Sequence, residues 1–410
     1  MKALVIAGGV PQIELINQLK ERDIYTILLD GNANALAKPY ADKFFAVNIF
    51  DIDAVKKIAE EERVDFLITC CADQVLLIVA QVSEMLGLPC YIDYETAKQV
   101  SDKELMKQVF LTNGIPTSRC VVMDQLDMTA IGQLKYPLIV KPVDAYSSRG
   151  VRKVENASEL QDAFNVAIEI SRNKKAIVEE FCQGEEISVD VFVSDGKAHV
   201  LCISNSEKIK AADKFVIFRG KFPVCASLLL QEKIQKVAQQ IAEAFHITNA
   251  PMLIQMISDG ENISVLEFCA RTGGAMKFLL IKRVCGFDVI KAVIDLTLGK
   301  KVRVETRAPE NQYIVNDFIY CKPGVFDHLE GFQELVDEGI LKDFHVLRPR
   351  GFVCNGQANS SGDRIAGMTI EAVTVEEFNR IHALILERIK VIDDQGNDII
   401  RRELLPGLES

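Results

Sequence analysis

The stretch PMLIQMISDGENISVLEFCARTGG, residues 251–274, predicts a β-hairpin that decides how the rest of the chain is interpreted. Two apolar runs flank a central Asp-Gly dipeptide, which is typical of a tight turn between antiparallel strands. Glu267 and Arg271 lie at alternate positions of the second run, so their side chains share one face of the strand. A buried carboxylate and guanidinium are costly without partners. The hairpin therefore carries a candidate binding face, and Gln255 of the first strand is placed to join it.

The composition limits the classes of partner. A length of 410 residues favours several lobes, because single cores rarely grow beyond about 250–300 residues. The chain has 47 basic and 58 acidic residues, a net charge of −11, which argues against a nucleic-acid partner or an anionic membrane surface. No apolar run is long enough to span a bilayer. We therefore expect neither a nucleic-acid partner nor a membrane partner.

Cysteine and histidine are not spaced as metal ligands or as a disulfide framework. The 11 cysteines include no CxxC pair, and the 5 histidines are scattered. This pattern predicts reduced thiols packed as small apolar side chains, a cytoplasmic location and no zinc site.

The first hundred residues alternate apolar strands with amphipathic helices, a pattern that predicts a doubly wound α/β unit. The expected strands are 2–7, 25–30, 44–49 and 64–69, and the expected helices are 11–22, 52–62 and 74–86. The first strand leads into GGVPQ instead of GxGxxG, so a nicotinamide site is disfavoured. Asp30 and Asp73 follow expected strands, where they meet either a substrate amine or solvent.

The segment SDKELMKQVFLTNGIP predicts a helix that begins near residue 101. Ser101 and Glu104 have the spacing of a capping box. Lys103 and Lys107 are four residues apart and share one face of this helix. Both a solvated surface and a role in binding remain open for these lysines.

The segment YPLIVKPVDAYSSRGV predicts a short strand that ends at Lys141, followed by a loop over 144–150. Small residues in this loop allow backbone N–H groups to converge on phosphate oxygens, although many ordinary hairpins have the same composition. The sequence leaves both interpretations open.

The segment AIVEEFCQGEEISVDVFV predicts two strands separated by a break at residues 183–184. Acidic residues cluster around the break, at positions 179, 180, 185 and 186. They are either hydrogen-bond acceptors for a ribose or ordinary charged turn residues.

The remaining segments are assigned more coarsely. We expect helices over 231–246, from residue 274 to about 298, and over 375–389, and strands over 313–320 and 344–348. A basic segment before Pro223 either approaches a phosphate or substrate carboxylate or is a solvated loop; it contains Lys208, Lys210, Lys214, Arg219 and Lys221.

Taken in order, these segments resemble the ATP-grasp superfamily of carboxylate–amine ligases, nearest to its amino-acid ligases and its carbamoyl-phosphate-synthase-like group. The resemblance covers residues 1–300 well and the last hundred loosely. It implies α/β and α+β architecture in four parts. These are an N-terminal α/β domain (1–100), a small lobe with its linker helix (101–182), a large lobe (183–304) and a C-terminal α+β region packed on the large lobe (305–410).

The resemblance also implies which residues contact ATP. The set is Lys103, Lys141, Ser147, Ser148, Gly150, Glu179, Glu180, Phe181, Cys182 and Glu186. Its two lysines are expected at the phosphates, loop 144–150 over them, and the last glutamate at the ribose. The segment 179–182 is expected to form the hinge beside adenine.

Metal and catalytic roles follow from the same resemblance. Glu267 matches the principal Mg²⁺ ligand, Gln255 stands where a second carboxylate is usual, and Arg271 matches the arginine that stabilises the acyl-phosphate step. Cys269 replaces the usual asparagine, so either one or two ions, with Mn²⁺ as an alternative, remain open. Arg283 and Asp73 are candidate substrate contacts.

The implied activity is an ATP-dependent ligase that forms an amide or peptide bond through an acyl phosphate. Its partners are a small carboxylate, expected to be an amino acid, and an amine; a homodimer is common in the superfamily. Two alternatives remain: a degenerate ATP-grasp protein that binds nucleotide without turnover, and an ATP-grasp carboxylase.

Overall fold

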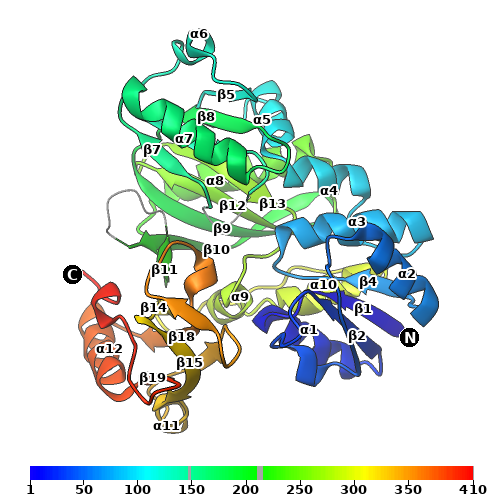
Figure 1. The fold of residues 1–410 in the computed structure, drawn as a ribbon, viewed down its shortest axis with the longest axis vertical. Helices are drawn as coiled ribbons and strands as arrows, with labels where there is room; N and C mark the ends of the chain where they lie inside the picture. Colours follow the sequence, from blue (N-terminus) through cyan, green and yellow to red (C-terminus); the bar gives the residue numbers. More distant parts are fainter. Residues whose placement is uncertain (146–148, 210–215, 410) are drawn as a thin grey trace.

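The N-terminal domain is a parallel sheet with helices on both faces, as the sequence predicts (Figure 1). The computed structural model describes residues 1–145, 149–209 and 216–409. The strands lie in the order β3-β2-β1-β4. Their bounds are β1 Lys2–Ile6, β2 Tyr25–Asp30, β3 Lys43–Ala46 and β4 Phe66–Ile68. The helices are α1 Val10–Lys20, α2 Ile52–Glu62 and α3 Asp73–Leu86, with a 3-10 turn η1 Lys38–Tyr40.

The small lobe is an antiparallel sheet of four strands in the order β5-β8-β6-β7. Its strands are β5 Cys120–Met123, β6 Leu138–Pro142, β7 Arg152–Val154 and β8 Ala176–Glu180. Its helices, with the two linker helices before it, are α4 Tyr94–Ser101, α5 Lys103–Thr112, α6 Met128–Ile131 and α7 Ala157–Ile170. Apolar residues of α7 pack on β6 and β8, so the opposite face of this sheet is turned towards the rest of the molecule.

One antiparallel sheet of eight strands joins the large lobe to the C-terminal region. Its order is β13-β12-β9-β10-β11-β14-β18-β16. The bounds are β9 Glu185–Ser194, β10 Lys197–Lys208, β11 Ile217–Phe222, β12 Ala250–Ser258, β13 Ile263–Cys269, β14 Tyr313–Ile319, β16 Asp343–Val346 and β18 Ala366–Ala372. Because β11 pairs with β14, the C-terminal region extends this sheet as well as packing on the large lobe.

The other elements cover this sheet and the N-terminal domain. They are the helices α8 Leu228–Ala244, α9 Lys277–Cys285, α10 Val289–Thr297, α11 Phe332–Asp337 and α12 Val375–Arg388, and the 3-10 turns η2 Ser361–Asp363 and η3 Arg402–Leu404. A separate sheet contains β17 Val353–Asn355, β15 Pro323–Glu330 and β19 Lys390–Asp393. In the described part of the chain, none of the helices has the length and apolarity needed to cross a bilayer. All 11 cysteines are free thiols.

Two local predictions were wrong. The helix expected from residue 274 to about 298 is two helices, because Gly286 adopts a left-handed φ of 76° after α9. The cap of α5 is Asp102, whose carboxylate accepts hydrogen bonds from the N–H groups of Glu104 and Leu105. Ser101 is the last residue of α4, and its hydroxyl donates to the Ala97 carbonyl instead.

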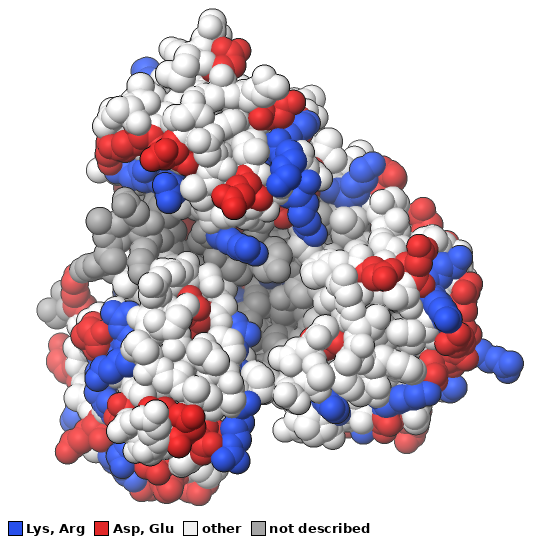
Figure 2. Space-filling view, in the orientation of Figure 1, with Lys and Arg blue, Asp and Glu red and all other residues white. Residues whose placement is uncertain are grey.

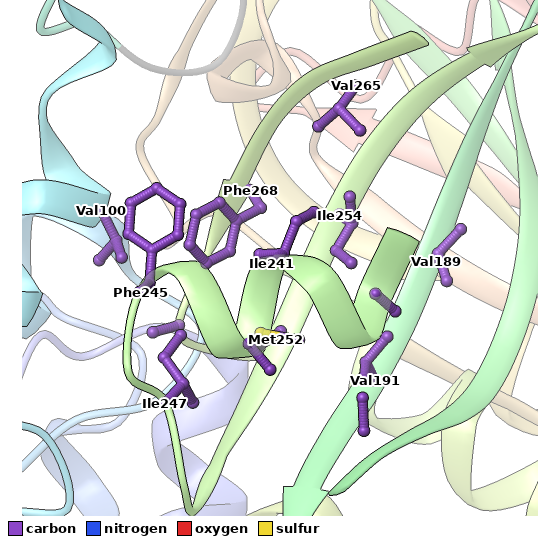
Figure 3. Packing of buried hydrophobic residues seen from close by; sticks show 14 of the residues in the cluster. Val100, Val189, Val191, Ile241, Phe245, Ile247, Met252, Ile254, Val265 and Phe268 are labelled. Carbon is purple, nitrogen blue, oxygen red and sulfur yellow. The ribbon is translucent and has the colours of Figure 1, made fainter. Parts of the chain in front are cut away.

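A large apolar core lies between α5, α8 and the β12–β13 hairpin (Figure 3). Three phenylalanines meet there: the Phe245 and Phe268 ring centroids are 4.6 Å apart, and Phe110 lies 5.9 Å and 6.0 Å from them. Phe268 follows Glu267 on β13, so burial of its ring turns the glutamate to the opposite face of the hairpin. This core therefore fixes which way the binding face of the hairpin points.

We predict that Phe268→Ala lowers the free energy of unfolding by about 3–5 kcal/mol, because it leaves a cavity among buried aromatic rings. The urea midpoint of the variant, followed by circular dichroism, measures this loss. Leu228→Ala is the control, since that side chain is 79% exposed, and it is expected to change the midpoint little. An equal midpoint for wild type and Phe268→Ala would contradict the assignment of this core.

Candidate active site

A cavity of about 640 Å³ lies where the N-terminal domain, the linker helices, the large lobe and the C-terminal region meet. Figure 2 shows the surface hollowed at this junction. Five residues of the predicted site pattern line the cavity: Lys103, Gln255, Glu267, Cys269 and Arg271. The structure therefore brings both strands of the hairpin face and the first residue of α5 into one space.

The register of the hairpin places Gln255 directly opposite Glu267. A bulge follows Gln255, and the amide nitrogen of Gln255 donates to Glu186 Oε1 at 3.1 Å. Glu186 lies on β9 and also forms an ion pair with Lys208. A row of oxygen-bearing side chains thus crosses β13, β12 and β9, which joins the expected metal ligands to the expected ribose ligand.

Lys103 connects α5 to this row. Its ammonium nitrogen lies 3.2 Å from Glu267 Oε2 and donates to the Ala145 carbonyl at 2.8 Å. The Asp102 cap fixes the start of the helix, so the lysine leaves α5 at its first residue. The cation is therefore held between the segment that follows strand β6 and the hairpin.

Lys141 lies inside the small lobe against Glu179. Its ammonium nitrogen is 2.5 Å from Glu179 Oε1, and the ammonium of Lys107 is 3.0 Å from Glu179 Oε2. Ser118 adds a hydrogen bond to the same carboxylate at 2.9 Å. Burial alone raises the pKa of Glu179, but the attraction of Lys141 and Lys107 outweighs it and lowers the pKa to about 2. The Lys141 pKa is lowered by burial and raised more by Glu179 and Glu267, so both groups are charged at neutral pH.

Glu179 therefore differs from Glu180, the next residue of the expected hinge, in the burial of its side chain. Its side chain is buried between two lysines, whereas Glu180 forms an ion pair with Arg119 near the surface. The backbone N–H of Glu180 donates to the Arg119 carbonyl at 3.0 Å and is therefore already used. The expected adenine contact from the Glu180 backbone would have to come from its carbonyl oxygen. The backbone roles of Phe181 and Cys182 stay predictions; the Phe181 amide donates to Pro137, and the Cys182 thiol to Ser264 at 3.3 Å.

The loop expected over the phosphates is described only in part. Ser147 and Ser148 lie outside the described residues. Gly150 has a left-handed φ of 76°, and a Cβ at this position would lie 2.8 Å from the Ile170 side chain. Both observations require glycine at the end of the loop, although they do not test its contact with ATP.

A second buried ion pair lies beside Arg271, and the sequence analysis did not identify it. Lys277, the first residue of α9, lies 3.2 Å from Asp190 on β9 and donates to the Ser204 hydroxyl at 2.5 Å. Burial raises the pKa of Asp190 even though Lys277 and Arg271 oppose the shift. The alternating pattern of β9 places Asp190 on the same face as Ser188, a residue that lines the cavity, and this spacing was the available signal.

Of the two candidate substrate contacts, Arg283 has other partners, and Asp73 stays a prediction. Arg283 is bound by Asp343 and Glu371, each at 2.6 Å, and it is not among the cavity-lining residues, so it links α9 to β16 and β18. Asp73 begins α3, and its side chain is outside what the structure describes. The other carboxylate, Asp30, accepts hydrogen bonds from the N–H groups of Gly8 and Asn32 and so holds the turn after β1.

Two residues of the basic segment, Arg219 and Lys221, are paired with carboxylates that do not line the cavity. Arg219 is fully buried and forms a two-point ion pair with Asp317, and Lys221 pairs with Glu207. Lys208 pairs with Glu186 at the site, whereas Lys210 and Lys214 lie outside the described residues.

Comparison with known proteins agrees with this geometry. An ATP-grasp domain model matches residues 134–278. The carbamoyl phosphate synthase large chain of Clostridium acetobutylicum is 22% identical over 82% of this chain, which spans about a third (33%) of that protein. The phosphoribosylamine–glycine ligase of Methanocaldococcus jannaschii is 23% identical, over 99% of this chain and 97% of the relative.

A solved structure with a similar fold is the L-amino acid ligase from Bacillus licheniformis, with a TM-score of 0.79 and 19% identity. The match covers 96% of this chain and 98% of that one. This likeness concerns the fold. The domain match identifies an ATP-grasp domain over residues 134–278, and the chain is similar to proteins named as a carbamoyl phosphate synthase large chain and a phosphoribosylamine–glycine ligase.

The pairing of Glu179 predicts a pH-dependent loss of stability. The folded pKa of about 2 lies below the ordinary 4.5, so the pair stabilises the fold above about pH 4.5 and loses this effect as the pH falls towards 2. We predict that Glu179→Gln costs about 3–5 kcal/mol at pH 7, because it leaves two buried lysines without their carboxylate. Urea unfolding should show that the difference in unfolding free energy between wild type and Glu179→Gln narrows below pH 4.5. There the unfolded wild-type chain protonates this carboxylate before the folded protein does.

Glu180→Gln is the matched control, since its ion pair with Arg119 lies near the surface, and we expect a change of about 0–1 kcal/mol. A Glu179→Gln variant as stable as this control would contradict the assignment of Glu179, Lys141 and Lys107 as a buried charged cluster.

Proposed function

We propose that the protein is an ATP-dependent ligase that joins a small carboxylate, expected to be an amino acid, to an amine through an acyl phosphate. One observation carries this proposal: Lys103, Gln255, Glu267 and Arg271 line a single cavity, and the charge of Glu267 raises the pKa of the nearby Lys141. Such a cluster of cations around a carboxylate suits a polyanionic triphosphate. The similarity to proteins named as ligases supports the same class.

In the proposed reaction, a substrate carboxylate oxygen attacks the γ-phosphorus of ATP and displaces ADP. The amine then attacks the acyl carbon, displaces phosphate and loses a proton to solvent, which leaves an amide. Lys103 and Lys141 would hold phosphate oxygens, and Arg271 would donate hydrogen bonds to the oxyanion that develops at the acyl carbon. Arg271 is only 9% exposed to solvent, so little water screens its charge. Positioning and charge therefore account for the chemistry without a side-chain nucleophile.

The donor set near Glu267 fits one Mg²⁺ better than two. Mg²⁺ accepts one or two protein oxygens together with phosphate oxygens, and Glu267 and Gln255 are adjacent oxygen donors. The Cys269 thiol is directed to the Leu253 carbonyl at 3.9 Å and offers no hard ligand. When bound, the ion would neutralise charge on the transferring phosphate.

The second candidate is a protein that binds nucleotide without turnover. It is favoured by one observation: Gln255 and Cys269 stand where the resemblance expects a carboxylate and an asparagine, and the Cys269 thiol is directed to the Leu253 carbonyl. The two candidates differ in whether substrate-dependent phosphate is released.

A homodimer also stays a prediction, which light scattering of the purified protein tests.

Phosphate release tests the proposed function directly. The protein is mixed with ATP, Mg²⁺ and pooled amino acids, and we expect phosphate only when a substrate acid is present. Arg271→Ala is predicted to lower kcat by about 10²–10³-fold, by analogy with the loss of one oxyanion donor. The affinity for ATP, measured by calorimetry, should change little in this variant.

Three outcomes decide between the alternatives. No substrate-dependent phosphate from folded protein that binds ATP would support the non-catalytic candidate. Phosphate release stimulated by bicarbonate alone would instead indicate a carboxylase. Full activity of Arg271→Ala would remove that residue from the mechanism.

ATP binding itself should depend on Lys141. We predict that Lys141→Ala weakens ATP binding by about 10–100-fold, because a charged hydrogen bond contributes about 1.5–3 kcal/mol. Lys175→Ala is the control, since Lys175 belongs to the same lobe but forms a surface ion pair with Glu104. Isothermal calorimetry with ATP and Mg²⁺ measures both variants. Wild-type affinity in Lys141→Ala would remove this nucleotide contact.

A further inference from the structure

The C-terminal region contributes two arginines, Arg348 and Arg364, to the lining of the active-site cavity. Arg348 follows β16, and Arg364 follows the 3-10 turn η2. Both side chains are half-buried, so their charges are partly removed from water. The resemblance that assigned the nucleotide contacts did not assign a role to either arginine.

Neutral groups hold Arg364 in place. Its Nε donates to the Tyr320 hydroxyl at 3.1 Å, and its Nη2 donates to the Ile217 carbonyl at 2.7 Å. The guanidinium also lies 4.0 Å from the centroid of the Phe318 ring. These contacts fix the orientation of the guanidinium, and because the groups are neutral they do not compensate its positive charge.

Arg348 is held in the same manner. Its Nε donates to the Gly362 carbonyl at 2.8 Å, and the guanidinium lies 5.2 Å from the Phe352 ring centroid. Burial lowers the pKa of Arg348; the nearby Asp363 opposes this shift and the charge of Arg364 adds to it. The two arginines are therefore close enough to repel each other.

No ion pair joins either arginine to a carboxylate within residues 1–145, 149–209 and 216–409. Asp363 is the nearby acid, and one of its oxygens already accepts hydrogen bonds from the backbone N–H groups of Asn359 and Ser360 at 2.9 Å and 3.0 Å. By contrast, Arg219 and Arg283 each have carboxylate partners. Two half-buried like charges with neutral supports are unfavourable unless an anion binds between or beside them.

We propose that Arg348 and Arg364 form a subsite for an anionic group of the substrate, a carboxylate or a phosphate that takes no part in bond formation. This inference rests on the proposed function, because it assigns the substrate side of the same cavity. Guanidinium groups suit this task, since their planar donors match two oxygens of a carboxylate or phosphate. The subsite would select substrates that carry a fixed negative charge in addition to the reacting group.

The experiment compares Arg348→Met and Arg364→Met with wild type in the phosphate-release assay. With an anionic substrate, each variant is expected to raise the substrate KM by about 10–100-fold, with the ATP KM and kcat nearly unchanged. With an analogue whose anionic group is replaced by a neutral amide or hydroxyl, variants and wild type should perform alike. Amino acids and phosphorylated amines, tested separately, distinguish a carboxylate from a phosphate. Arg364→Lys should restore part of the affinity because it keeps the charge.

Arg350→Met is the matched control. Arg350 lies two residues after Arg348, its side chain is 79% exposed, and it pairs with Asp327 at 2.6 Å. It should leave every kinetic constant unchanged. A KM for the anionic substrate that both Arg348→Met and Arg364→Met leave unchanged, or an equal loss with the neutral analogue, would overturn the subsite.

Failure of the proposed function has a different signature. If wild type releases no phosphate with any acid, the subsite is tested by calorimetric titration with inorganic phosphate. Wild type and Arg350→Met should then bind phosphate at least about tenfold more tightly than the Arg348→Met/Arg364→Met double variant. Equal binding by all three proteins, or no binding by wild type, would overturn the subsite independently of the ligase assignment. Circular dichroism confirms that each variant is folded.

Discussion

A buried carboxylate between two lysines is the constraint on which the small lobe of this protein depends. Glu179 is 2% exposed and is bound by Lys141 from β6 and Lys107 from α5, so it ties the linker helix to the sheet of the small lobe. Three charges out of water are tolerable only because each has a partner of opposite sign. The cluster of Glu179, Lys141 and Lys107 carries one excess positive charge. Under the proposed function, this excess would be held in a fixed place before the triphosphate arrives.

The hairpin face uses the same principle on the other side of the cavity. Lys103 is 3.2 Å from Glu267, and Lys208 is paired with Glu186, so the protein compensates its own charges without nucleotide. The Phe268 ring, buried on the opposite face of β13, holds the carboxylate towards the cavity. Packing and electrostatics thus act on neighbouring residues of one strand.

Continuity of the eight-stranded sheet explains why the C-terminal region takes part in the site. Pairing of β11 with β14 carries the sheet from the hairpin to β18 and β16, and the buried Arg219–Asp317 pair fastens this junction. The connections beside these last strands then line the cavity with Arg348 and Arg364. A boundary at residue 304, reasonable from the sequence, therefore divides two parts of one sheet and of one site.

The sequence by itself determined the alternation of strands and helices in the N-terminal domain and the two strands of the β12–β13 hairpin, because the period of apolar residues is a local property. It also placed Glu267 and Cys269 on one face, since strand side chains alternate, whereas Arg271 follows the end of β13 and still lines the cavity. It did not predict α4, α7, β10 or β11. The tertiary structure alone decided the cross-strand register of Gln255, which depends on a bulge, and the partners of each charged residue. Arg283 and Arg219 were candidates for ligand contacts, yet carboxylates 60 to 98 residues away in the sequence neutralise them. Arg348 and Arg364 were not candidates in the sequence analysis, yet they line the cavity. The role of a charged side chain depends on which distant groups lie within a few ångströms of it, and no local pattern of residues contains that information.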